Sequence, residues 1–109
     1  MASALGATSE RQPAWSGNFF VVDQLLEAEN NAVRAGLLLR LPDAVVASKV
    51  VQMQAACREV GFELGSDFLD VRLAHQSAMR DRQGNLPSPI VEQLEYWRRG
   101  MVAIAEARP

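Results

Sequence analysis

Residues 90–104 read IVEQLEYWRRGMVAI, and their apolar side chains recur at steps of four and three. Residues 46–60, VASKVVQMQAACREV, repeat this pattern. On an α-helix, such a spacing places the apolar side chains on one side. The two stripes are Ile90, Leu94, Trp97, Met101 and Ile104, and Val46, Val50, Met53, Cys57 and Val60. Because each stripe needs an apolar partner, the sequence predicts an all-α fold built by helix packing.

Proline, glycine and small polar residues divide the chain into four expected helices, over residues 18–40, 42–60, 66–79 and 89–107. Gly61 followed by Phe62 fits a left-handed cap that ends the second helix. Ser66 is the expected N-cap of the third helix, with Asp67 in its first turn. Residues 80–88 contain Gly84, Asn85 and Pro87, which predict an exposed linker before the fourth helix.

The first expected helix is apolar over a wide arc, because two stripes lie side by side on it. One stripe is Leu25, Ala28, Ala32, Ala35 and Leu39, and the other is Val22, Leu26, Val33 and Leu37. Small residues in the first stripe predict a close approach of a neighbouring helix near Gly36. A chain of 109 residues forms about one domain and leaves part of its apolar surface uncovered. We therefore expect a small four-helix bundle-like domain over residues 17–109, or an intertwined helical homodimer, behind a flexible arm of residues 1–16.

From the composition we expect a cytoplasmic protein. Cys57 is the only cysteine, so the chain cannot form an internal disulfide. No stretch is long and apolar enough for a membrane span, and the first residues lack the pattern of a secretory signal. Ten of the eleven basic residues are arginine, which is typical of proteins from GC-rich bacteria. The net charge of −2 does not favour nucleic acid as the default ligand.

Four carboxylates, Glu59, Glu63, Asp67 and Asp70, form the acidic cluster that is the best candidate for chemistry. Carboxylate oxygens suit Mg²⁺ or Mn²⁺, so one alternative is a metal-dependent hydrolase. Residues 63–70 faintly resemble the second acidic motif of the helical nucleotide pyrophosphohydrolases. That family also has two glutamates one helical turn apart on an earlier helix, whereas Glu27 and Glu29 here are two residues apart.

His75 is the only histidine, which excludes a multi-histidine metal site within one chain. Its context departs from the phosphotransfer domains, since Ala78 and Met79 stand where those domains have a lysine and a small residue. We expect a half-buried packing residue with one hydrogen bond. No serine lies in a glycine elbow and no phosphate-binding loop is present, so no catalytic residue and no cofactor is predicted.

Arg80 and Arg82 supply a second alternative, a weak nucleic-acid-binding regulator that contacts phosphates. A helix-turn-helix centred on Gly61 would present Asp67 and Asp70 to the DNA, and phosphates would repel both carboxylates. The arginines are more simply explained as solvated charges.

The last helix carries Tyr96, Trp97, Arg98 and Arg99 in succession, and Tyr, Trp and Arg are enriched in interface hot spots. Successive helical residues point about 100° apart, so these four side chains cannot all be buried in one small monomer. Trp15 and Phe19 are expected to form a second contact. The sequence thus predicts a non-catalytic protein-interaction module, adaptor-like, regulatory or chaperone-like, that binds a second copy of itself, another protein, or both.

Overall fold

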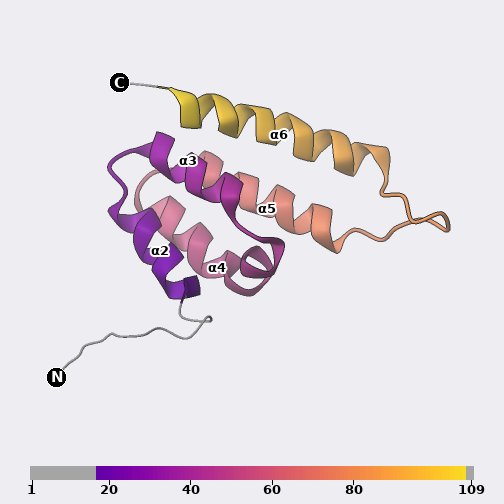
Figure 1. Cartoon of the computed structure of the whole chain (residues 1–109), viewed down its shortest axis with the longest axis horizontal. Coiled ribbons are helices and arrows are strands. Elements are labelled where there is room, and N and C mark those ends of the chain that lie inside the picture. Colours follow the sequence, from indigo (N-terminus) through magenta and orange to yellow (C-terminus); the bar gives the residue numbers. More distant parts are fainter. Residues whose placement is uncertain (1–16, 108–109) are drawn as a thin grey trace.

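The computed structural model describes the backbone of residues 17–107 and the side chains of residues 21–107, and in this part of the chain all regular structure is helical (Figure 1). The helices are α2 (Gly17–Glu27), α3 (Asn31–Arg40), α4 (Asp43–Glu59), α5 (Glu63–Ser77) and α6 (Ser88–Glu106). The predicted all-α class is confirmed. The predicted arm, residues 1–16, lies outside the described residues. Within the described part, no helix has both the length and the apolar character to cross a bilayer.

The single first helix predicted over residues 18–40 is wrong, because the chain breaks between α2 and α3. Asn30 adopts an extended conformation as the N-cap of α3, and its side-chain oxygen accepts a hydrogen bond from the Val33 N–H at 3.0 Å. Arg34 then reaches back to α2, where its Nε donates to the Leu25 carbonyl at 2.7 Å. One of its terminal nitrogens donates to the Ala28 carbonyl at 2.8 Å. These bonds satisfy carbonyls at a helix end that would otherwise be unpaired.

The predicted cap at Gly61 is confirmed. Gly61 has a φ of +78°, and its N–H donates to the Arg58 carbonyl. The Phe62 N–H donates to the Cys57 carbonyl at 2.7 Å, which completes the two-bond glycine cap of α4. The cap turns the Phe62 side chain into the core, where it is buried.

Ser66 is not the N-cap of α5, which begins one turn earlier than predicted. The Phe62 carbonyl accepts hydrogen bonds from the N–H groups of Gly65 and Ser66, so a new helix starts directly after the glycine cap. Ser66 is buried inside this helix, and its hydroxyl accepts a bond from Arg58 at 2.9 Å. Asp67 therefore lies beyond the first turn, and Glu63 is the acidic residue in that turn.

The two apolar stripes predicted within residues 46–60 and 90–104 face the core. Val46, Met53, Cys57 and Met101 are at most 1% exposed, and the other stripe residues are buried or half-buried. Leu25 and Leu38 bring α2 and α3 to the same core. α4 packs most extensively on α5, and α6 lies across both α3 and α5 (Figure 1). The close approach expected at Gly36 is not found, because a Cβ placed there would meet only the tip of Arg40 at 3.4 Å.

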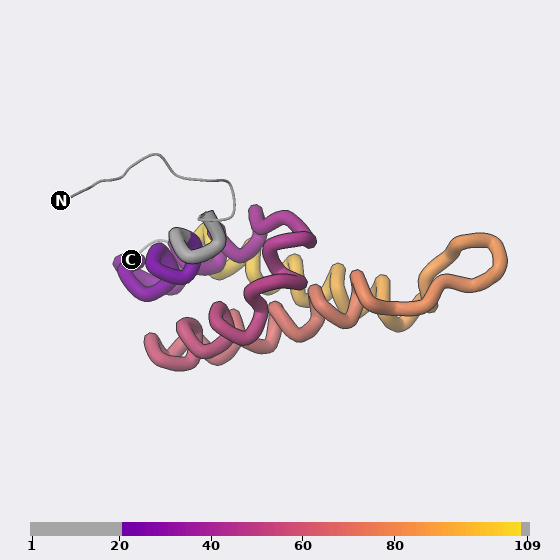
Figure 2. The backbone as a smooth tube through the Cα atoms, turned by 90° about the horizontal axis from the view of Figure 1, so that it is seen from below, coloured from indigo at the N-terminus to yellow at the C-terminus, as the bar shows by residue number. Residues whose placement is uncertain are grey.

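The far ends of α5 and α6 extend away from the other helices and are joined by the loop 78–87 (Figure 2). The Asp81 side chain accepts hydrogen bonds from the N–H groups of Gln83 and Asn85, both at 2.9 Å. Gly84 has a φ of +85°. The exposed linker predicted over residues 80–88 is thus confirmed, and it is an ordered turn held by its own polar groups.

Candidate functional site

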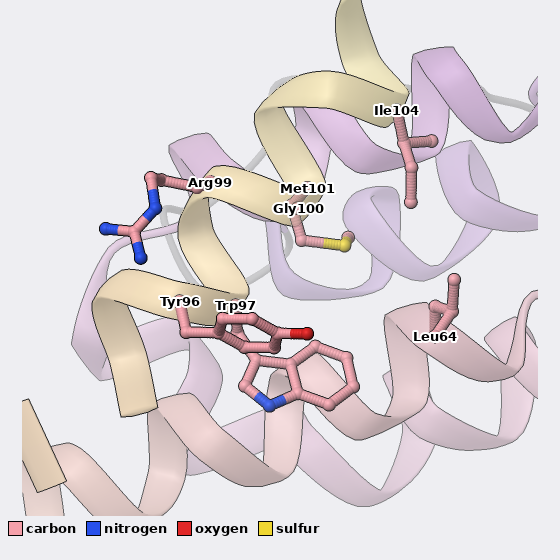
Figure 3. A pocket seen from close by; sticks show the side chains of 7 residues that line it. All are labelled: Leu64, Tyr96, Trp97, Arg99, Gly100, Met101 and Ile104. Carbon is pink, nitrogen blue, oxygen red and sulfur yellow. The ribbon is translucent and has the colours of Figure 1, made fainter. Parts of the chain in front are cut away.

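An apolar groove lies between α6 and the first turn of α5, and its volume is about 510 Å³ (Figure 3). Leu64 of α5 faces it across from α6, which contributes Tyr96, Trp97, Met101 and Ile104. Arg99 and Gly100 complete the lining. A concave apolar surface of this kind, with few polar groups, is typical of a binding site.

The groove brings together three of the residues predicted from the sequence, Tyr96, Trp97 and Arg99. The Trp97 indole points from α6 toward α5, and the Arg99 guanidinium points away from the groove (Figure 3). Trp97 is half-buried and packs against the core, whereas Tyr96 is 68% exposed. The groove therefore combines a fixed aromatic wall with an exposed aromatic side chain.

Arg98 does not line the groove, although the sequence groups it with its neighbours. It lines a separate polar pocket and makes a long ion pair of 3.8 Å with Glu95. Trp15 lies outside the described residues, and so does the side chain of Phe19. Leu64 is the groove residue that sequence reasoning missed. Leu64 is 49% exposed, and only the packing of α6 beside α5 makes it part of the groove wall.

The acidic cluster gains no support as a metal centre. Among the described residues, no group of three or more His, Cys, Asp or Glu side chains lies close enough to hold a metal ion. Asp70 accepts a hydrogen bond from Gln54 at 2.7 Å, so this carboxylate links α4 to α5. Glu59, Glu63 and Asp67 are exposed.

Arg80 stabilises the loop that contains it, because its guanidinium donates a hydrogen bond to the Gly84 carbonyl at 2.6 Å. Arg82 is exposed in the same loop. Both arginines thus belong to the loop 78–87 that joins α5 to α6.

Cys57 is fully buried and unpaired, as its place on the α4 stripe predicts. Burial raises the pKa of its thiol from 9.0 to about 11, and the positive charges of Arg34 and Arg58 oppose this effect only in part. The reactive thiolate is therefore disfavoured, and Cys57 acts as a small apolar core residue.

Stability should fall in alkaline solution because of this thiol. In the unfolded chain the thiol has a pKa of 9.0, whereas in the folded protein it stays neutral until about pH 11. Its contribution to the free energy of unfolding is therefore complete below pH 9 and is lost between pH 9 and about pH 11. At pH 10 the loss is about 1 kcal/mol relative to pH 8. Urea unfolding of the wild type and of Cys57→Ala at both pH values measures it. Equal pH dependence in the two proteins would contradict this assignment.

His75 is half-buried, as predicted, but the expected hydrogen bond of its side chain is not found in the described part of the chain. With Asp43, Arg72 and Arg98 it lines the polar pocket, whose volume is about 130 Å³. Arg72 was missed by sequence reasoning, because only the fold brings the end of α3 and the start of α4 to it.

Comparison of the chain with protein-family models, with curated proteins and with solved structures finds no match.

Proposed function

We propose that this protein is a non-catalytic protein-interaction module that binds through the groove between α5 and α6. The observation that carries the proposal is the 68% exposure of Tyr96 at the edge of an apolar groove. Tyr96 exposes an aromatic ring to water beside an apolar groove. A partner that covers both the ring and the groove buries apolar surface, which lowers the free energy of the complex. Tyrosine, tryptophan and arginine, all present here, are the residue types that dominate interface energetics.

A second copy of the chain is the partner that this surface favours. The exposed Tyr96 ring lies beside the groove that could receive it, so one patch contains both the projecting and the receiving part of a two-fold interface. Charge also fits an antiparallel pairing, since α6 carries Glu92 before this point and Arg99 after it. Two antiparallel copies of α6 would place opposite charges across the interface. A homodimer in the cytoplasm of a bacterium is the form that we propose.

Light scattering coupled to size-exclusion chromatography, applied to the full chain over a range of concentrations, tests this proposal. We expect a dimer, and we expect Tyr96→Ala to raise its dissociation constant at least tenfold with an unchanged circular dichroism spectrum. Met79→Ala is the matched control, because it also shortens a large exposed apolar side chain, one that is 86% exposed outside the groove.

Two results would contradict the proposed interface. A wild-type monomer at all concentrations would exclude self-association as the role of the groove. A dimer that Tyr96→Ala leaves intact, or that Met79→Ala weakens equally, would place the interface elsewhere.

A further inference from the structure

A second site is formed by the polar pocket on α6, which shares no lining residue with the groove. Four helices, α3 to α6, contribute to it. Its polar side chains are Asp43 of α4, Arg72 and His75 of α5, and Arg98 of α6. Leu39 of α3, Phe68 and Leu94 supply the apolar part of its wall. We infer that this pocket binds a small oxyanion, a phosphate or carboxylate group, between Arg72 and Arg98.

Arg72 is oriented in advance for this role. One of its terminal nitrogens donates to the Leu38 carbonyl at 3.0 Å, and the other forms an ion pair of 2.7 Å with Asp43. Its side chain is only 13% exposed. A guanidinium that is already ordered loses little conformational entropy when it binds a ligand, and its remaining donors match the oxygens of a carboxylate or phosphate.

Arg98 and His75 provide donors that the protein itself does not use. The Arg98 ion pair with Glu95 is 3.8 Å long, beyond hydrogen-bond distance. The His75 side chain has no hydrogen-bond partner among the residues that the structure describes. Both side chains line the pocket, so an oxyanion placed there would give their polar atoms the partners they lack.

The charge of the pocket favours an anion over a cation. Two guanidinium groups face one carboxylate, that of Asp43, which is already paired with Arg72. α4 begins at Asp43, and the N-terminal end of a helix adds positive partial charge. The volume of about 130 Å³ equals that of about four water molecules, which is enough for one phosphate or carboxylate group.

Isothermal titration of the full-length protein with inorganic phosphate, at constant ionic strength set with chloride, measures this binding. We expect saturable binding of one phosphate per chain and a dissociation constant about tenfold larger in Arg98→Gln. Arg82→Gln is the matched control, because it removes the same charge from an exposed residue that lines neither the pocket nor the groove. It should bind phosphate as the wild type does. Arg72 is left intact, since it also holds the end of α3.

Acetate in place of phosphate distinguishes the two ligand groups: tighter phosphate binding identifies a phosphoryl ligand, and tighter acetate binding identifies a carboxylate ligand. His75→Ala provides a second variant, and it should weaken binding about threefold. The inference is overturned if neither anion binds saturably, or if Arg98→Gln and Arg82→Gln weaken binding equally. Tyr96→Ala should leave phosphate binding unchanged, so this site and the proposed self-association can fail independently.

Discussion

Arg34→Met is expected to lower the free energy of unfolding by about 3 kcal/mol. Arg34 is buried, and in the described part of the chain it pairs with no carboxylate. Its guanidinium bonds the Leu25 and Ala28 carbonyls at the end of α2, and the Asn31 side chain at the start of α3. Methionine keeps the length of the side chain but leaves these oxygens without donors, and buried groups without partners are costly.

Arg40→Met is the matched control for this change, because Arg40 lies in the same helix and is exposed. We expect it to cost less than about 1 kcal/mol, the usual value of a positive charge near a helix end. Arg34→Lys should fall between the two variants, since an ammonium group can replace only part of the planar set of bonds. Chemical unfolding followed by circular dichroism measures all three. Similar losses in Arg34→Met and Arg40→Met would show that Arg34 does not hold α2 to α3.

Gly65→Ala is expected to lower the free energy of unfolding by about 2 kcal/mol, although alanine is the better helix former by about 1 kcal/mol. A Cβ at this position would lie 2.6 and 2.8 Å from two carbons of the Phe62 ring, and 3.0 Å from Leu38 Cδ1. Both neighbours are buried and cannot move aside without disturbing the core. Overpacking of this kind destabilises the protein by more than the better helix propensity of alanine stabilises it.

Gly36→Ala makes the same change in α3, but it should raise the free energy of unfolding. A Cβ there meets only the flexible end of Arg40, so the gain in helix propensity remains, about 0.5 to 1 kcal/mol. Thermal and urea unfolding of the two variants together test the packing. Stabilisation by both substitutions would show that α5 does not lie as close to Phe62 and Leu38 as the structure places it.

The groove was only half predictable from the sequence. Tyr96, Trp97 and Arg99 could be selected because their residue types and helical positions mark an interface. Leu64 could not, since it lies more than thirty residues earlier and meets α6 only through tertiary packing. The same holds for the polar pocket, where Arg72 and Arg98 are residues of two different helices.

By itself, the sequence determined which helix faces are buried and how α4 ends. Apolar periodicity is a local property of one helix, and a left-handed cap needs only a glycine at one position, so Met53, Met101 and Gly61 could be predicted without knowledge of the fold. Only the tertiary structure decided where the first apolar stretch breaks, where α5 begins and which glycine allows close packing. Each of these depends on bonds or contacts between residues that the fold brings together: Arg34 with the α2 carbonyls, Phe62 with the first turn of α5, and Gly65 with Leu38. A pattern within one helix carries no information about such partners, because their positions are set by how the helices pack.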